Sequence, residues 1–302
     1  MKSNDSVPVY VLGSMNVDHV FRVPHLVRPG ETLGTDAYGR FAGGKGLNQS
    51  VALRRAGVPV RHIGCVGDDG RFLLELLRDE GVEVRGVEVH DGPSGQAFIQ
   101  VDAAGENSIL LLAGANRLVS AEQLEKELAD ASPGDWFLAQ NESNLISEGI
   151  RLAKSRGLKV AFNPAPMGPD VAAVPFACVD LLILNETEAM ELAGNADPQT
   201  ALSRLHERYP ALEIVLTQGS KGACSLGPSG SFHEPSRAVR VEDTTAAGDC
   251  FVGYFLAAYR RQADLRFALR QGCRAAELSV GRPGAMPSIP RLEEVRTYCA
   301  ED

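Results

Sequence analysis

The chain has 302 residues and 44% hydrophobic content, which suffices for a sizeable buried core without disulfide bonds or a structural metal. Its formal net charge of −9 argues against a nucleic-acid or anionic-membrane partner, because either would call for clustered Lys and Arg. The six cysteines form no CxxC pair. No apolar run approaches the ~18 residues of a membrane span, and the apolar run near the amino end is too short for a signal peptide. We therefore expect reduced thiols and a cytoplasmic location.

The first part of the chain predicts short strands separated by glycine-rich turns. Strands are expected at 7–12, 17–23, 35–41 and 60–66, and helices in AGGKGLNQSVALRRAG and GDDGRFLLELLRDEG. The pattern then changes to short alternating strands, with a hairpin turn at 103–107. This hairpin and the strands near 17–23 and 35–41 predict a small separate sheet. We expect it to form a lid from two excursions, about 15–42 and 93–114.

From residue 136 onwards the sequence predicts strands and helices in turn. The expected strands are 136–139, 158–162, 181–184 and 214–217, and the expected helices are 144–156, 186–192 and 199–208. Continuous apolar runs such as LLIL are typical of strands that are covered on both faces. The second part of the chain therefore predicts an α/β fold with a mainly parallel sheet and helices on each side.

Two polar groups near the amino end are candidate ligand contacts. In AGGKGLNQ (42–49) the glycines precede a helix, but the GxxxxGK[ST] spacing of a P-loop is absent. Either this is a tight turn with a solvated lysine, or a ligand approaches the bare backbone while Lys45 and Asn48 donate hydrogen bonds to it. Asn16 and Asp18 follow the first strand, where ligand contacts and local turn bonds are equally compatible with the sequence.

Two further motifs follow strands of the predicted sheet. NETE, which contains Asn185 and Glu188, begins a helix, so helix capping and metal binding are equally good interpretations. TQGSKG (217–222) either places backbone amides near a phosphate or forms a plain hairpin turn. Neither motif alone assigns a function.

DTTAAGD (243–249) combines a helix start with a carboxylate in its first turn. Bare backbone amides at Ala246, Ala247 and Gly248 can stabilise the charge that builds on a transferring phosphoryl group. Asp249 lies beside them and can accept a proton from an attacking hydroxyl. The alternative is an ordinary aspartate at a helix N-terminus. The motif favours phosphoryl transfer.

The motifs GSMNVDH, PGET, AGGKGLNQ, GCVGDDG, GENSILLLAGAN, NES, NPAP, NETE, TQGSKGA, DTTAAGD and RPGAMPSIP occur in this order over nearly the whole chain. The set resembles the ribokinase-like (PfkB) family of carbohydrate kinases, and the pair GGKGxNQ and DTTAAGD is highly specific. This resemblance implies a single three-layer α/β/α domain over 1–302, with a mainly parallel central sheet and a small β-sheet lid. It also implies a homodimer formed through the lids.

The resemblance implies roles for individual residues. Asp249 would be the catalytic base, beside an anion hole of Ala246, Ala247 and Gly248. Sugar contacts are implied for Asn16, Asp18, Gly44, Lys45, Asn48, Glu142 and Asp249. Nucleotide contacts are implied for Asn185, Thr217, Gly219 and Gly248, and a water-mediated contact to Mg²⁺ for Glu188. The site of an activating K⁺ would be formed by Asp243, Thr245, Ser279, Arg282, Gly284 and Ser288.

The implied reaction is transfer of the γ-phosphate of ATP to the 5-hydroxyl of D-ribose. Apart from the base Asp249, the set contains two acids, two asparagines and one lysine, which suits a compact molecule with several hydroxyls and favours a free sugar over a nucleoside. The alternatives are deoxyribose, 2-keto-3-deoxygluconate, pseudouridine or another nucleoside as acceptor, and a non-catalytic sugar-binding sensor. Two residues depart from the family pattern: Asn141 stands where an apolar residue is expected, and Glu277 lies in a helix segment that usually has small residues near the adenine. Both departures concern fine specificity and leave the phosphoryl-transfer residues unchanged.

Overall fold

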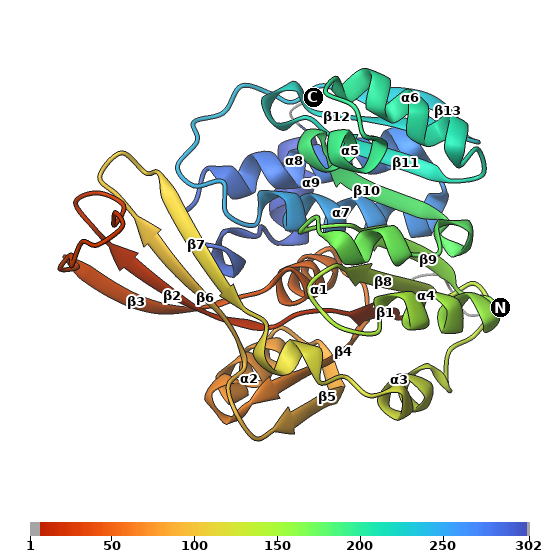
Figure 1. Ribbon diagram of the computed structural model, residues 1–302. Coiled ribbons are helices and arrows are strands. Elements are labelled where there is room, and N and C mark those ends of the chain that lie inside the picture. The colour runs from red at the N-terminus through yellow and green to blue at the C-terminus, as the bar shows by residue number, and fades with distance from the viewer. Residues whose placement is uncertain (1–6, 301–302) are drawn as a thin grey trace.

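The computed structural model describes residues 7–300, which form two β-sheets and a set of covering helices (Figure 1). The strands are β1 (Val9–Leu12), β2 (Asn16–Arg22), β3 (Ala37–Gly43), β4 (Val60–Gly67), β5 (Glu83–His90), β6 (Gly95–Val101), β7 (Asn107–Leu112), β8 (Trp136–Gln140), β9 (Lys159–Asn163), β10 (Leu181–Asn185), β11 (Glu213–Thr217), β12 (Ala223–Gly227) and β13 (Gly230–Glu234). The α-helices are α1 (Lys45–Arg55), α2 (Arg71–Asp79), α3 (Ala121–Leu128), α4 (Ile146–Ser155), α5 (Glu186–Ala193), α6 (Pro198–Arg208), α7 (Ala247–Gln262), α8 (Leu265–Val280) and α9 (Leu292–Cys299).

The central strands of the large sheet, β1, β4 and β8 to β11, are buried on both faces. Within residues 7–300 its strand order is β13-β12-β11-β10-β9-β8-β1-β4-β5, and only the β11–β12 and β12–β13 pairs are antiparallel. Successive side chains of β1 point to opposite faces, so Val9 and Val11 pack with α1, α2 and α7 to α9, while Tyr10 and Leu12 pack with α3 to α6. The predicted α/β fold, with a mainly parallel sheet between two helix layers, is confirmed (Figure 1).

Helices α1 and α7 cross the same face of the sheet in close contact. A Cβ atom added to Gly253 of α7 would lie 2.4 Å from the Cβ of Ala52 and 2.9 Å from the backbone nitrogen of Leu53, both on α1. The start of α1 in turn lies against the end of β1, because a Cβ atom on Gly46 would lie 2.4 Å from the Cα of Gly13. Glycine at these contacts brings the N-termini of α1 and α7 close to the end of β1.

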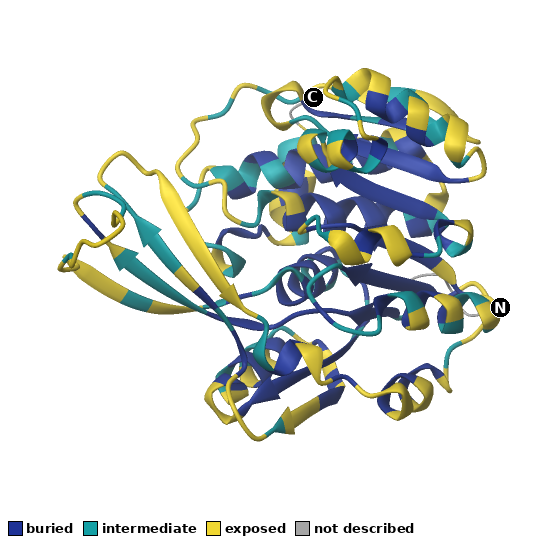
Figure 2. Ribbon diagram, in the orientation of Figure 1, coloured by how far each residue is buried: buried dark blue, intermediate teal, exposed yellow. Residues whose placement is uncertain are grey.

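The small sheet projects from the body of the molecule in the order β3-β2-β6-β7 (Figure 1). Its base is fixed to the short helix η2 (Asp68–Gly70): Asp69 Oδ1 accepts hydrogen bonds from Ser94 N at 2.9 Å and Ser94 Oγ at 2.7 Å, and Asp69 Oδ2 accepts one from Gln96 Nε2 at 2.9 Å. Its outer strand β7 is exposed along its whole length (Figure 2). Among residues 7–300, no helix has the length and apolar character needed to cross a bilayer.

Candidate active site

A cavity of about 260 Å³ lies where the carboxyl ends of β9 to β11 meet the N-termini of α1, α5 and α7. The carboxyl edge of a parallel sheet is where such folds place ligands, because backbone amides of the following helices point there. The predicted site residues that line this cavity are Lys45, Asn185, Glu188, Thr217, Ala246, Gly248 and Asp249. Segments more than 200 residues apart in the sequence therefore meet at one point.

Asp249 occupies the first turn of α7 and is only 7% exposed. Its Oδ2 accepts a hydrogen bond from Asn48 Nδ2 at 3.0 Å, and its Oδ1 accepts one from Gln49 Nε2 at 2.8 Å. The charge of Asp249 raises the pKa of the nearby Lys45 ammonium more than burial lowers it. The site thus holds a fixed carboxylate next to a protonated lysine.

The N-terminus of α7 opens onto the cavity without a side-chain cap. Ala246 adopts a left-handed conformation with φ of 60°, which turns the chain sharply into the helix. A Cβ atom on Gly248 would meet nothing within 4 Å, so the space in front of this residue is open. Ala247 lies outside the cavity lining, and its amide donates to the carbonyl oxygen of Thr244 at 3.2 Å. The free end of the helix fits an anion such as a phosphate.

A second polar group lies next to Lys45, on the side of the small sheet. Glu142 Oε2 accepts hydrogen bonds from the backbone nitrogen of Lys45 at 3.0 Å and from Ser14 Oγ. Asn16 Oδ1 accepts one from Asn116 Nδ2 at 2.7 Å. The Glu142 bonds connect the end of β8 to the start of α1 and to the turn between β1 and β2, and the Asn16–Asn116 bond connects the start of β2 to the short helix η3 (Gly114–Arg117). We call these residues the polar wall.

Asp18 lies on β2 opposite Phe41 of β3, two residues before Gly43. Burial, followed by the negative charge of Glu142, raises the pKa of Asp18 to about 7. A Cβ atom on Gly43 would lie 2.0 Å from Asp18 Oδ2, so only glycine leaves room for this carboxylate. The next residue, Gly44, has φ of 94° and caps α1. The glycines therefore make space for Asp18 and start the helix that carries Asn48.

Asn185 and Glu188 form the N-terminal capping box of α5. Asn185 Oδ1 accepts from the backbone nitrogen of Glu188 at 2.9 Å, and Glu188 Oε2 accepts from that of Asn185 at 3.0 Å. Both residues also line the cavity, and burial raises the pKa of Glu188. Asn185 and Glu188 can therefore cap α5 and also contact a ligand in the cavity. Gly219 starts the short helix η6 (Gly219–Lys221) after β11 and lies outside the cavity lining.

Two loops meet beside the N-terminus of α7 through Asp243. Its Oδ1 accepts from the backbone nitrogen of Thr245, and its Oδ2 accepts from that of Gly284, each at 2.8 Å. Burial raises the pKa of Asp243 and the hydrogen bonds from Thr245 and Gly284 lower it, with a net shift downwards. Asp243 therefore stays ionised and ties the loop at 281–285 to the loop that precedes α7.

The remaining residues predicted around a monovalent cation lie at the end of α8, in the loop at 281–285 and in the short helix η7 (Met286–Ser288). Ser279 Oγ and Ser288 Oγ are 2.8 Å apart, and both serines are fully buried. The Arg282 side chain turns to Glu294, with 2.5 Å between Nη2 and Oε1. Because the Arg282 guanidinium is paired with Glu294, the backbone carbonyl oxygen is the group of Arg282 that can face a cation.

The sequence matches the family described as pfkB family carbohydrate kinase over residues 8–292. The chain belongs to this family. A ribokinase from Haemophilus influenzae is 37% identical over 299 residues, covering 95% of this chain and 97% of the relative. A deoxyribokinase from Salmonella typhimurium is 32% identical over 300 residues, covering 96% and 98%. The crystal structure of a ribokinase from Cryptococcus neoformans in complex with ADP has a TM-score of 0.85 at 35% identity, covering 97% of this chain and 99% of that one.

Membership of the family confirms the expected class of reaction, phosphoryl transfer to a carbohydrate hydroxyl. The family resemblance seen in the sequence motifs is likewise confirmed over nearly the full length. The two departures from the family pattern, Glu277 and Asn141, are both engaged in hydrogen bonds within the chain.

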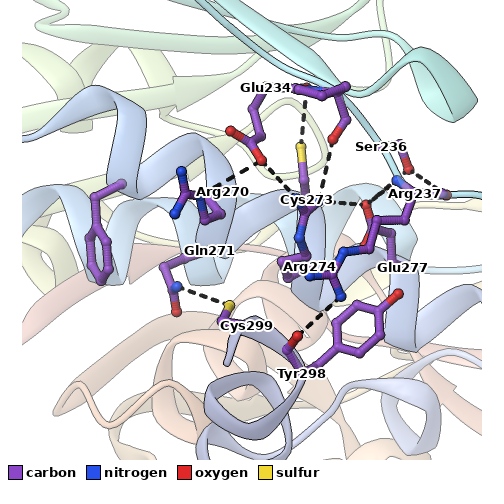
Figure 3. Close-up of polar contacts among 12 residues, drawn as sticks. Glu234, Ser236, Arg237, Arg270, Gln271, Cys273, Arg274, Glu277, Tyr298 and Cys299 are labelled. Atoms are coloured by element: carbon purple, nitrogen blue, oxygen red, sulfur yellow. Dashed lines mark hydrogen bonds and ion pairs between the residues drawn. The ribbon is translucent and has the colours of Figure 1, made fainter. Parts of the chain in front are cut away.

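Glu277 lies at the centre of a buried polar cluster between α8 and the segment after β13 (Figure 3). Its Oε1 accepts from the backbone nitrogen of Arg237 at 2.8 Å, from Ser236 Oγ at 3.1 Å and from Arg274 Nη1 at 2.9 Å. Arg274 also contacts Glu234 Oε1 at 2.9 Å through its Nη2. The charge that Glu277 introduces in the family helix is therefore compensated by Arg274, and the pair holds the strand end against α8.

Asn141 connects the end of β8 to the NPAP loop. Its backbone nitrogen donates to the carbonyl oxygen of Ala165 at 2.9 Å, and its Nδ2 donates to that of Pro166 at 2.9 Å. These bonds account for a polar residue at this position without a ligand.

Several residues of the site were not predicted from the sequence. Asn163 and Thr244 line the cavity, Gln49 contacts Asp249, and Ser14 and Asn116 hydrogen-bond to the polar wall beside Lys45. All five lie in motifs quoted above: Ser14 in GSMNVDH, Gln49 in AGGKGLNQ, Asn116 in GENSILLLAGAN, Asn163 in NPAP and Thr244 in DTTAAGD. The motifs located these segments, but they did not assign a role to these individual residues.

Proposed function

We propose that the protein transfers the γ-phosphate of ATP to the 5-hydroxyl of D-ribose. The observation that carries this proposal is the contact between Asn48 of the sugar side and Asp249 at the open N-terminus of α7. Asn48 Oδ1 is also buried without a partner among residues 7–300, which leaves an acceptor for a sugar hydroxyl. The ribokinase names of the Haemophilus and Cryptococcus relatives support ribose as the acceptor.

In the proposed reaction Asp249 accepts the proton of the 5-hydroxyl as its oxygen attacks the γ-phosphorus. A new O–P bond forms, the bond between the γ-phosphorus and the β–γ bridging oxygen breaks, and ADP leaves with that electron pair. The open amides at Ala246 and Gly248, together with the Lys45 ammonium, stabilise the charge on the transferring group. Ala247 joins this anion hole if its amide exchanges the carbonyl of Thr244 for the phosphate.

The sugar and nucleotide would bind on opposite sides of Asp249. On the sugar side we assign the polar wall and the glycine-rich loop, namely Asn16, Asp18, Gly44, Lys45, Asn48 and Glu142. On the nucleotide side we assign Asn185, Thr217, Gly219 and Gly248. Their positions support this division, since the nucleotide set follows β10, β11 and the start of α7.

The site fits the two cations that the family resemblance implies. Glu188 is a cavity-lining carboxylate, and Mg²⁺ held through water there would neutralise phosphate charge. For K⁺ we assign the oxygen-rich loops with Asp243, Thr245, Ser279, Arg282, Gly284 and Ser288, because oxygen donors suit a hard cation and these loops adjoin the anion hole. Within residues 7–300 no cluster of three His, Cys, Asp or Glu side chains forms a metal site, so phosphate oxygens of ATP would supply other Mg²⁺ ligands.

We further propose that the small sheet is a lid over the sugar, formed by excursions at about 15–42 and 93–114 of a single domain, 1–302. The strand register places Phe41 and Leu111 on the same face as Asp18, and they are 54% and 57% exposed. An exposed apolar face next to the sugar suits a homodimer in which two lids cover one another. A cytoplasmic location is supported by six free cysteine thiols.

The role of Asp249 is tested by Asp249→Asn. We expect kcat to fall by at least roughly 10²-fold while binding of the sugar survives, because the asparagine keeps the shape but cannot accept the proton. Steady-state kinetics with D-ribose and ATP, together with calorimetric sugar binding, measure both quantities. A variant with near-normal kcat would remove Asp249 as the base.

A second acceptor, deoxyribose, is favoured by the similarity to the Salmonella deoxyribokinase. An acceptor panel at fixed ATP, read by ADP release with and without K⁺, separates the two. If deoxyribose gives the higher kcat/KM, ribose is not the principal acceptor.

A further inference from the structure

Gln49 is a fully buried glutamine that contacts the proposed base directly. It lies on α1 next to Asn48, and its Nε2 donates to Asp249 Oδ1 at 2.8 Å and to Asn163 Oδ1 at 3.0 Å. Its Oε1 accepts from Gln140 Nε2 at 2.8 Å. All the hydrogen-bonding atoms of this amide are therefore engaged inside the protein, and none is left for the sugar or the nucleotide.

The direction of every bond in this network is determined from its two ends. At one end the carboxylate of Asp249 can only accept, so it must face the amide nitrogen of Gln49. At the other end Asn163 Nδ2 donates to the carbonyl oxygen of Ile183 at 2.9 Å, so Asn163 Oδ1 must face the same nitrogen. Gln140 then completes the network by donating to Gln49 Oε1. A rotated Gln49 amide would place its oxygen against two acceptors.

We propose that Gln49 is a positioning residue for phosphoryl transfer, held in orientation by Gln140 and Asn163. Together with Asn48 it supplies one amide donor to each oxygen of Asp249. Two donors on two oxygens fix the carboxylate plane and direct its remaining acceptor capacity at the attacking hydroxyl. This inference rests on the proposed role of Asp249 and adds Gln49 as the residue that orients the Asp249 carboxylate.

The proposal predicts a loss of kcat without a loss of substrate affinity. Gln49 touches neither substrate in the proposed arrangement, so its removal should leave both KM values unchanged. The base, however, must be aligned within a fraction of an ångström at the transition state. Gln49→Met keeps the length of the side chain but removes its donors and acceptor. We expect kcat to fall at least ~10-fold, with KM for sugar and ATP within about twofold of the wild type.

Gln123→Met is a matched control for the loss of a buried amide. Gln123 is 3% exposed, and its Nε2 donates to the carbonyl oxygens of Gly64 at 2.8 Å and Gly86 at 2.9 Å, away from the cavity. Its replacement should lower the thermal unfolding temperature and leave kcat unchanged. Equal losses of kcat in Gln49→Met and Gln123→Met would show a general effect of destabilisation and overturn the proposal.

The full-length variants are assayed with D-ribose and ATP, or with the best acceptor of the panel, beside Asp249→Asn. A large loss in Asp249→Asn with wild-type kcat in Gln49→Met overturns the positioning role alone. Wild-type kcat in Asp249→Asn removes Asp249 as the base and, with it, the positioning role of Gln49. Only a wild type that releases no ADP with any acceptor of the panel overturns the proposed function itself. If Gln49→Met does not fold, Gln140→Met tests the proposal instead, because it removes the hydrogen bond that orients the Gln49 amide. We expect the kcat of Gln140→Met to fall at least ~3-fold at unchanged KM. An unchanged kcat refutes the proposal.

Discussion

Replacement of Asp18 by asparagine should stabilise the protein at neutral pH more than at acidic pH. Burial and the charge of Glu142 raise the pKa of Asp18 from 3.8 to about 7. Because the folded-state pKa lies above the unfolded value, the folded protein retains the proton between about pH 4 and about pH 7. The wild-type free energy of unfolding therefore decreases as pH rises through this interval. Asparagine does not titrate in this interval, so the free energy of unfolding of the variant does not show this decrease.

The size of the effect follows from the shift in pKa. About three pKa units at 1.36 kcal/mol each give ~4 kcal/mol above pH 7, which is an upper bound because Asp18 is only partly buried by surface area. Urea unfolding followed by circular dichroism, from about pH 4 to about pH 8, measures the difference between variant and wild type. A difference that does not grow over this interval refutes the reasoning.

A control with the opposite sign is Asp197→Asn. The hydrogen bonds from Thr200 lower the pKa of Asp197, so its stabilising contribution is present above the unfolded pKa and lost as pH falls. The free energy of unfolding of the wild type should therefore increase relative to that of Asp197→Asn as pH rises. Relative to that of Asp18→Asn, it should decrease. Parallel behaviour of the two variants would mean that titration elsewhere dominates both curves.

Two glycine substitutions test the close contacts that shape the site. Gly253→Ala should lower the free energy of unfolding, measured in urea, by ~1–3 kcal/mol, because the added methyl group would collide with Ala52. Gly34→Ala is the control: its methyl group enters open space and should change the free energy of unfolding by less than ~0.5 kcal/mol. Equal effects would refute the close crossing of the helices. Gly43→Ala should raise the sugar KM at least ~10-fold and leave the ATP KM unchanged, because its methyl occupies the place of the Asp18 carboxylate; an unchanged sugar KM would contradict this.

The sheet was predictable because burial on both faces leaves a local trace. Runs such as LLIL in β10 are apolar at every position, and the structure buries all four of these residues. Shorter elements left no such trace. Helix α9 has eight residues and only one buried side chain, Val295, so no apolar periodicity identified it. The antiparallel β12 and β13 at the sheet edge were not among the predicted strands, although the hairpin interpretation of TQGSKG agrees with the turn between β11 and β12.

The site was predictable where its chemistry is carried by a compact motif. Asp249 and Gly248 belong to one helix start, and Asn185 with Glu188 carries the spacing of a capping box. The contact between Gln49 and Asp249, in contrast, joins residues 200 positions apart. The motif AGGKGLNQ marks the segment of Gln49, but the sequence does not show that its amide reaches Asp249 and not a partner in the core, as the Gln123 amide does.

The crossing of α1 and α7 at Gly253 gives the two sides of the site a rigid common frame. Asn48 and Gln49 are less than two turns from the contact along α1, and Asp249 is one turn from it along α7. Because this contact is made by a glycine backbone and a methyl group, it contains no rotatable side chain that could change the distance. The distance between the two helix backbones is therefore fixed, and alignment of donor and acceptor depends only on the side chains of Asn48, Gln49 and Asp249 and on the hydrogen bonds that hold them.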